Sequence, residues 1–280
     1  MTASPSLHSS DASGSERLEV YLASDLHLGS PSFAGSRNRE LAFTRWLEEA
    51  AAGQGHAEGH PATEFHLVGD LFDFWYEYRH VVPRGGARLM GAIARITDAG
   101  IPVHFYTGNH DLWTFGYLEE ELGVRVHTSP QLFQWGSRRC LVGHGDGLGP
   151  GDRGYKRLKR LFHNPILQRM FQTIHPDWTH GFARRWSASS RESQQLGAFA
   201  PIRPEQEWLW VYACDYLRDI DPDMDLFFFG HRHLPLELDL ITPPHRTRSL
   251  TPRYVNLGDW IQYYTYVHLN ETGYALRSFR

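Results

Sequence analysis

The chain has 280 residues, of which 41% are hydrophobic and 14% aromatic, so it can bury a sizeable core as one large domain. It contains no run of about 18 apolar residues and only two cysteines, which excludes a membrane-spanning helix and a disulfide framework. Residues 1–16 are rich in Ser and lack the apolar segment of a secretory signal. We therefore expect a cytoplasmic protein with a disordered leader over 1–16 and one enzyme-sized domain over 17–280.

Short apolar runs that end in polar turns predict five buried strands, at 18–24, 64–69, 102–107, 138–143 and 225–230. Between the first three, apolar residues recur at helical spacing over 38–52 and 86–98. Alternating strands and helices favour a mostly parallel sheet that is covered on both faces. Further strand-like runs joined by tight turns indicate a second, partly antiparallel sheet, at 254–258, 263–269 and 274–279. The sequence thus predicts a layered α/β sandwich.

The basic charge is concentrated in residues 150–205, where ten Lys and Arg stand against four Asp and Glu. This window has a net charge of +6 although the whole chain has −4. Large apolar residues are interleaved with the basic ones, a pattern typical of amphipathic helices that meet an anionic interface. The same pattern also suits a pair of helices packed on the core, or a solvated charged face. Interruption by large aliphatic residues argues against binding to nucleic acid.

Polar residues able to bind ions follow each of the five predicted strands. In chain order they are Asp25 and His27, then Asp70, then Asn109, His110 and Asp111, then His144 and Asp146, then His231 and His233. A single His at a strand end is more often structural than functional. Because ligand sites form at the carboxyl ends of strands in α/β sheets, however, five such placements together predict one shared site. We expect the i, i+2 pairs in extended segments to turn both side chains toward it.

Seven of these residues are candidate metal ligands: Asp25, His27, Asp70, Asn109, His144, His231 and His233. A mixed set of carboxylate, imidazole and amide groups without Cys suits Mn, Fe or Zn. Seven ligands are too many for one ordinary ion, and they suit two ions that share a bridging carboxylate. Two divalent ions against two carboxylates leave a formal charge of +2, which favours a phosphate ligand.

In this order, the motifs Asp-x-His, Gly-Asp, Gly-Asn-His-Asp, Gly-His and Gly-His-x-His resemble those of the calcineurin-like metallophosphoesterases, over about residues 18–270. The resemblance implies a four-layer αββα sandwich. It implies one metal ion held by Asp25, His27, Asp70 and His233, and a second held by Asp70, Asn109, His144 and His231, so that Asp70 bridges them. It also implies that His110 stabilises the phosphoryl transition state or protonates the leaving group, and that Asp111 orients His110.

Within that family, the runs around Asp25, Asp70 and His144 resemble the UDP-2,3-diacylglucosamine hydrolases of the lipid A pathway. The gap of 87 residues between His144 and His231 supports this, because it exceeds one βα unit by about 50 residues. In those hydrolases a helical cap at this position takes the acyl chains, which places a cap insertion at about 150–205 here. The resemblance implies attack on the α-phosphorus of the UDP-sugar, which yields UMP and 2,3-diacylglucosamine 1-phosphate (lipid X).

The same resemblance implies two divalent ions, with Mn²⁺ as the expected metal and Fe, Zn or Mg as alternatives. It implies substrate contacts from Asn109, Asp146, Tyr155, Arg157, Ser190 and Arg191. The expected location is the cytoplasmic face of the inner membrane, with peripheral attachment. We expect neither nucleic acid nor an obligate protein partner.

His110 departs from the narrower pattern, because many of those hydrolases carry Arg at this position. The general phosphoesterase pattern has His there, so the substrate stays open between the diacyl sugar and another phosphomonoester, phosphodiester or nucleotide. The basic, aromatic insert argues against a small soluble ester, which has no use for it. A non-catalytic binding module predicts missing ligands, and all seven are present.

Overall fold

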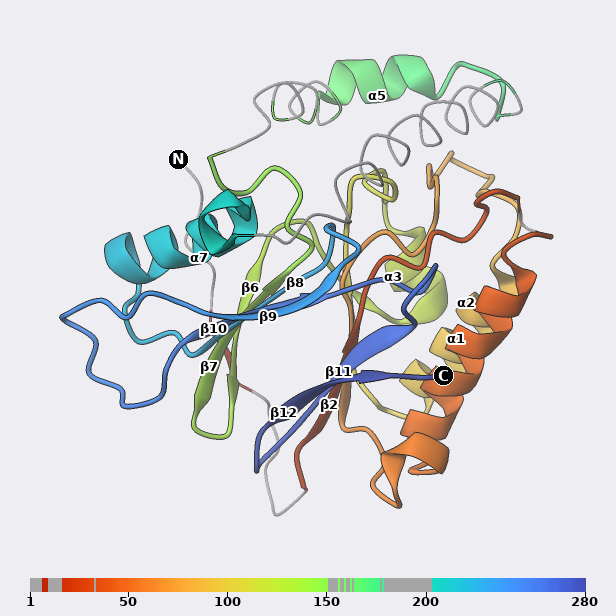
Figure 1. Ribbon diagram of the computed structural model, residues 1–280. Helices are drawn as coiled ribbons and strands as arrows, with labels where there is room; N and C mark the ends of the chain where they lie inside the picture. The colour runs from red at the N-terminus through yellow and green to blue at the C-terminus, as the bar shows by residue number, and fades with distance from the viewer. Residues whose placement is uncertain are drawn as a thin grey trace.

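The computed structural model describes residues 7–9, 17–32, 34–150, 164–176 and 203–280, together with positions 156, 159, 162 and 178. Within these residues two six-stranded sheets pack face to face, and helices cover their outer faces (Figure 1). No helix in these ranges is both long and apolar enough to cross a membrane.

The first sheet has the strand order β12-β11-β2-β3-β4-β5. Parallel pairing joins β2 (Glu19–Ala23), β3 (Glu64–Leu67), β4 (Val103–Tyr106) and β5 (Arg125–His127). Antiparallel pairing joins β2 to β11 (Thr265–Asn270), and β11 to β12 (Tyr274–Ser278). The outer face is covered by α1 (Arg37–Ala51), α2 (Ala87–Asp98) and α3 (Tyr117–Leu122), with the 3-10 turn η1 (Gly55–Ala57) after α1. Phe43 and Leu47 of α1 and Leu89 and Ile93 of α2 recur at helical spacing and are buried against this sheet.

The second sheet has the order β1-β6-β7-β8-β10-β9. Its strands are β1 (Leu7–Ser9), β6 (Gln131–Trp135), β7 (Arg138–Gly143), β8 (Leu226–Phe229), β9 (Pro235–Asp239) and β10 (Arg253–Leu257). After the 3-10 turn η2 (Pro204–Gln206), helix α7 (Trp208–Asp219) covers the outer face of this sheet. Its apolar side, with Leu209, Ala213 and Leu217, packs on Phe227 and Phe229 of β8. The inner faces of both sheets share a third apolar cluster, so the predicted four-layer αββα sandwich is confirmed.

All eight predicted strands and both predicted helices are confirmed within two residues at each end. The prediction that 254–258, 263–269 and 274–279 form a separate sheet is wrong, because β10 pairs with β8 and β11 pairs with β2. The centres of both sheets are buried on both faces, so apolar runs from either sheet look alike in the sequence. Within the predicted leader, Leu7–Ser9 differs from expectation and forms β1 beside β6. Disorder elsewhere in 1–16 stays a prediction.

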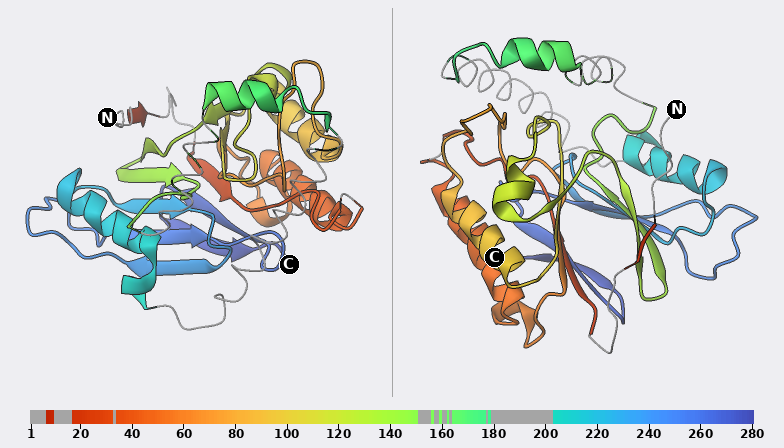
Figure 2. Two further views of the ribbon diagram at one scale, coloured as in Figure 1. Left: turned by 90° about the horizontal axis from the view of Figure 1, so that it is seen from above. Right: turned by 180° about the vertical axis from the view of Figure 1, so that it is seen from behind.

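A short helix, α5 (Pro165–Phe171), lies over the loops at one end of the sheets and belongs to the predicted cap (Figures 1 and 2). It begins at Asn164, whose side chain accepts hydrogen bonds from the N–H groups of Ile166 and Leu167, at 2.9 Å and 3.4 Å. Pro165 suits the first helical turn because it has no N–H that needs a partner there. A helix thus occurs where the cap was predicted, and most of the remaining predicted cap lies outside the described residues.

Candidate active site

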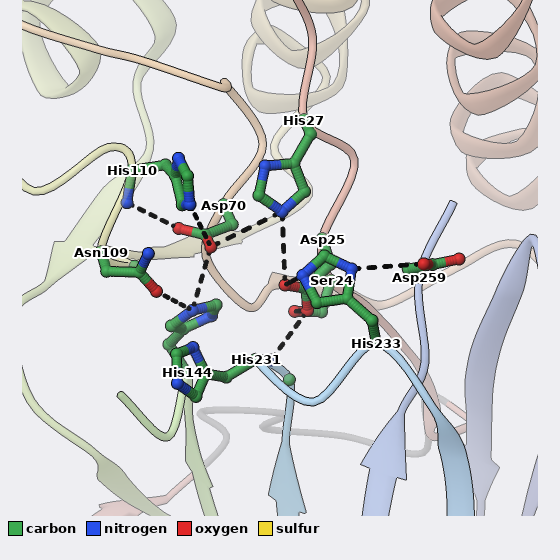
Figure 3. Close-up of polar contacts among 12 residues, drawn as sticks. Ser24, Asp25, His27, Asp70, Asn109, His110, His144, His231, His233 and Asp259 are labelled. Carbon is green, nitrogen blue, oxygen red and sulfur yellow. Dashed lines mark hydrogen bonds and ion pairs between the residues drawn. The ribbon is translucent and has the colours of Figure 1, made fainter. Parts of the chain in front are cut away.

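All seven candidate metal ligands lie together where strands of the two sheets end (Figure 3). Loops after β2, β3 and β4 of the first sheet carry four of them: Asp25, His27, Asp70 and Asn109. Loops after β7 and β8 of the second sheet carry the other three: His144, His231 and His233. The site therefore spans the junction of the two sheets.

Asp70 lies at the centre of the cluster. Its Oδ2 is 3.6 Å from Nε2 of His27 and 3.4 Å from Nε2 of His144. On one side, Oδ1 of Asp25 lies 3.7 Å from Nε2 of His27 and 3.4 Å from Nε2 of His233. The side chains thus form neighbouring groups that can each hold a metal ion, among them Asp25 with His27 and His233, and Asp70 with His144 and His231.

The group of Asp25, His27 and His233 presents two buried atoms that have no hydrogen-bond partner within the described chain. They are Oδ1 of Asp25 and Nε2 of His27, both in side chains that are fully buried. Leaving a buried polar atom without a partner costs free energy, and most such atoms in proteins are satisfied. A cation between these atoms would satisfy both, so the residues present fit a metal site.

The charge balance around Asp70 also favours a cation. Burial opposes a charge on His144, but the carboxylates of Asp70, Asp25 and Asp146 together outweigh burial and raise the pKa of His144 to about 10. Nδ1 of His144 lies 2.9 Å from the carbonyl oxygen of Val68, so Nδ1 carries the proton of the neutral ring and Nε2 faces Asp70. Positive charge is therefore strongly stabilised beside Asp70, and a divalent ion there would supply it.

Five of the seven ligands have a left-handed backbone, with φ from 46° to 68°. They are Asp25, His27, Asp70, His231 and His233. Residues other than Gly seldom adopt this conformation, and those that do concentrate at functional sites. The prediction of extended geometry for the i, i+2 pairs is therefore wrong, although both members of each pair do reach the site. In each pair, the left-handed backbone at both residues turns the two side chains toward the site, which an extended segment was expected to do.

Glycines at the strand ends leave room for the ligand side chains. A Cβ atom on Gly108 would lie 2.7 Å from the backbone nitrogen of Asp70, and one on Gly230 would lie 2.6 Å from Oδ2 of Asp25. Both distances are too short for any larger residue. The Gly that precedes Asn109 and His231 in the motifs is therefore a packing requirement of the ligands themselves.

Comparison with known proteins agrees with this geometry. The sequence model described as "Calcineurin-like phosphoesterase" matches residues 18–235. The chain belongs to this family. Calcineurin-like phosphoesterases are metal-dependent hydrolases, so this chain is a hydrolase whose clustered ligands can hold divalent ions.

Two similar proteins carry the same enzyme name. A UDP-2,3-diacylglucosamine hydrolase from Porphyromonas gingivalis is 34% identical and aligns over 94% of this chain and 98% of its own length. A protein of the same name from Serratia proteamaculans is 25% identical, over 78% of this chain and 83% of its own. Among solved structures, the phosphoesterase Yfce from E. coli is 12% identical over 94% of both chains, with a TM-score of 0.45.

His110 of this phosphoesterase faces the ligand cluster but is held differently from the prediction. Its Nε2 lies 4.0 Å from Oδ2 of Asp70, and its Nδ1 lies 2.9 Å from the carbonyl oxygen of Asp73. The carboxylate of Asp111, predicted to orient His110, instead accepts backbone hydrogen bonds from Asp70, Leu71 and Gly108, at 3.2, 2.8 and 2.7 Å. Asp111 therefore fixes the loop after β3, and the carbonyl of Asp73 fixes the tautomer of His110.

Asp111 is fully buried, and burial together with the charge of Asp70 raises its pKa to about 7. Its three backbone donors act in the opposite direction, because hydrogen bonds to a carboxylate stabilise the charged form. Burial and the charge of Asp70 thus oppose the backbone donors in their effect on the pKa of Asp111. Removal of the carboxylate would leave three buried N–H groups of the site without this acceptor.

The predicted substrate contacts divide into three sets. Asn109 lies in the phosphoesterase site, with Oδ1 3.4 Å from Nε2 of His144. Asp146 is buried, and its Oδ2 forms an ion pair of 2.6 Å with Nζ of Lys159, which lies in the segment where the cap was predicted. The other four lie outside the described residues: Tyr155, Arg157, Ser190 and Arg191.

Three residues that support the ligands were not predicted from the sequence. The Ser24 hydroxyl donates to Oδ2 of Asp25 at 2.5 Å, Oδ1 of Asp73 lies 3.5 Å from Nδ1 of His27, and Oδ2 of Asp259 lies 3.2 Å from Nδ1 of His233. Asp259 directly follows the predicted strand 254–258. The strand-end rule that found the ligands would therefore also have found Asp259.

Proposed function

We propose that this phosphoesterase cleaves the diphosphate of UDP-2,3-diacylglucosamine to UMP and 2,3-diacylglucosamine 1-phosphate. The observation that carries the hydrolytic part is that the seven ligand side chains lie together, with Asp70 at their centre. The substrate rests on the relatives that bear this enzyme name, of which one aligns over nearly the full length of both chains.

We assign one ion to Asp25, His27, Asp70 and His233, and the other to Asp70, Asn109, His144 and His231. Mn²⁺ is our first choice of metal, ahead of Fe, Zn and Mg, because the ligands are carboxylate, imidazole and amide groups. Divalent ions held by these residues would polarise phosphoryl oxygens and acidify water. Asp70 then serves both ions, and the backbone N–H of His110 donates to its other oxygen, Oδ1, at 2.9 Å.

The contacts of the His110 ring support a role for it in the cleavage of the diphosphate. Because a carbonyl oxygen can only accept, Nδ1 of His110 donates to Asp73 and Nε2 is left facing the ligand cluster. When the ring also carries a proton on Nε2, as imidazolium, it can stabilise charge on phosphoryl oxygens or give that proton to the leaving group. We propose this role for His110, with Asp111 supporting the loop beneath it.

The cap is proposed to take the acyl chains and to attach the enzyme peripherally to the cytoplasmic face of the inner membrane. One side of the cap is docked: the Tyr76 hydroxyl donates to the carbonyl of Gln168 at 2.8 Å, and the ring of Phe171 lies 4.8 Å from those of Tyr76 and Trp113. On other sides, Ile166, Met170 and Trp178 are 68%, 62% and 76% exposed. These exposed apolar side chains offer a surface for acyl chains or lipid.

A substrate panel tests the function. With Mn²⁺ added, we expect kcat/KM for the UDP-diacyl sugar to exceed that for p-nitrophenyl phosphate esters and cyclic nucleotides by about 10² or more, because only the first fills the cap. Product analysis should give UMP. Equal or higher activity on the small esters would instead support a general phosphoesterase, and no hydrolysis of any substrate would contradict the enzyme assignment.

Substitutions of Trp178 and Phe171 test whether the cap binds acyl chains or only packs on the domain. Trp178→Glu is expected to raise KM for the diacyl sugar about tenfold or more, since burying one large side chain against acyl carbon is worth roughly 1.5–3 kcal/mol. Hydrolysis of a small phosphodiester should be unchanged, because Trp178 is exposed and contacts none of the ligands. The measurement is KM on both substrates, together with the melting temperature.

Phe171→Glu is the contrasting variant. Its ring packs on Tyr76 and Trp113, so we expect a lower melting temperature and a loss of both activities. Thr173→Glu, which adds the same charge at an exposed position of the cap, should change neither. Equal loss on the two substrates in Trp178→Glu would contradict the proposed acyl site.

A further inference from the structure

The connection between β10 and β11 passes from one sheet to the other beside the ligand cluster. Its backbone is left-handed at Gly258 and Tyr264, with φ of 73° and 56°. The hydroxyl of Thr265 closes the connection by donating to the carbonyl of Leu257 at 2.6 Å. This turn carries Asp259, which is 4% exposed and is drawn beside His233 in Figure 3.

The two carboxylate oxygens of Asp259 have separate partners. Oδ1 accepts from the backbone N–H groups of Gln262 and Tyr263, at 2.8 Å and 3.1 Å. Oδ2 lies 3.2 Å from Nδ1 of His233. With Oδ1 fixed by the turn, Oδ2 has little freedom to move away from the imidazole ring. The next residue, Trp260, donates its backbone N–H to the carbonyl of Asp25 at 3.1 Å. One turn thus holds two residues of the same ligand group.

This contact determines which nitrogen of His233 faces the site. An ionised carboxylate can only accept a hydrogen bond, so Nδ1 of His233 carries the proton. Nε2 is then unprotonated and lies 3.4 Å from Oδ1 of Asp25. A carboxylate behind a metal-binding imidazole also raises its basicity and fixes the orientation of its ring.

His233 depends on such a contact more than the ligands beside it. Its side chain is 18% exposed, whereas those of Asp25 and His27 are fully buried. The packing that holds His27 from all sides is therefore incomplete around His233. One face of the His233 ring stacks on His27, at 4.9 Å between centroids, and the hydrogen bond to Asp259 restrains rotation about that stack.

We propose that Asp259 is a positioning residue for His233 and that it sets the affinity of the ion held by Asp25, His27, Asp70 and His233. The proposal rests on the two-metal function proposed above. Its effect is selective: the other ion depends on Asn109, His144 and His231, none of which contacts Asp259 in a hydrogen bond or ion pair found among the described residues.

The test is calorimetric titration of the metal-free protein with Mn²⁺, which reads binding without any turnover. Asp259→Ala is expected to weaken one of two binding steps by about 10–100-fold and to leave the other unchanged. Asp259→Asn should lie between, because an amide oxygen still accepts from Nδ1 but carries no charge. Uniform weakening of both steps, or weakening of neither, would overturn the proposal.

Thr265→Val is the matched control for the turn. It removes the hydrogen bond to Leu257 but touches no ligand, so the melting temperature should fall while both affinities stay unchanged. Selective loss in this variant would show that any damage to the turn is sufficient, which would also overturn the role of Asp259. If the unmodified protein bound a single ion, the two-metal proposal would fail. The role of Asp259 would still be tested, because Asp259→Ala would have to lower the affinity for that single ion if Asp259 positions His233.

Discussion

Replacing Asp70 by Asn is expected to abolish hydrolysis and to lower the occupancy of both metal positions. Oδ2 of Asp70 lies between the imidazoles of His27 and His144, and an amide NH₂ there would present a donor where cations are expected to bind. Asn is the sharper substitution, because it tolerates the left-handed backbone of Asp70, at φ 54°, and its Oδ1 can still accept from His110. Ala would add backbone strain to the loss of the ligand.

We expect the hydrolysis rate of Asp70→Asn to fall by about 10⁴-fold or more. Each ion would stabilise transition-state charge by several kcal/mol, so loss of both should raise the activation free energy by more than about 5 kcal/mol. Metal content per chain, measured after gel filtration, is the second readout. Asp219→Asn, at an exposed aspartate of α7 that pairs with Arg218, should leave both readouts unchanged. Two full equivalents of metal in Asp70→Asn would refute the bridging assignment.

Replacing His110 by Ala is expected to keep both metals and yet to slow hydrolysis by about 10²–10⁴-fold, the usual range for a positioned acid, base or charge-stabilising group. The ring lies edge-on to His27, at 4.7 Å between centroids, but the hydrogen bond from His110 to Oδ1 of Asp70 comes from the backbone N–H and survives the substitution. This separates His110 from His144, whose replacement should cost metal as well as rate.

The leaving group distinguishes two roles for His110. If the ring donates a proton, the loss should be much smaller for a p-nitrophenyl ester, whose leaving group needs no proton, than for the UDP-sugar. If the ring only stabilises phosphoryl charge, both substrates should lose rate equally. His245→Ala, at an exposed loop position, is the control and should behave as the unmodified enzyme. Loss of metal in His110→Ala would mean that His110 is a ligand.

The ligand positions could be predicted because the chain repeats one local rule. A short buried strand ends, often at a Gly, and a side chain able to bind metal follows, as at Gly69 and Asp70 or Gly230 and His231. Parallel strands bring such ends to a common edge whatever their separation in sequence. The rule does not state which sheet each strand joins, and β10 and β11 were therefore grouped wrongly.

The contacts behind the ligands could not be predicted in the same way. Asp111 is adjacent to His110 in sequence, but its carboxylate turns to backbone N–H groups that the loop after β3 leaves without strand partners. Phe171 and Trp178 are both aromatic residues of an amphipathic segment, and periodicity treats them alike. Only the packing shows that Phe171 meets the domain and that Trp178 faces outward.

The left-handed backbone of five ligand residues lowers the stability of the fold while it directs their side chains into the site. Strained residues of this kind cost on the order of 1–3 kcal/mol each, and Gly at the same positions would remove most of that strain. The side chains at these five positions therefore serve the site and not the stability of the fold. Replacing His231 or His233 by Gly should therefore raise the stability of the metal-free protein while it removes a ligand.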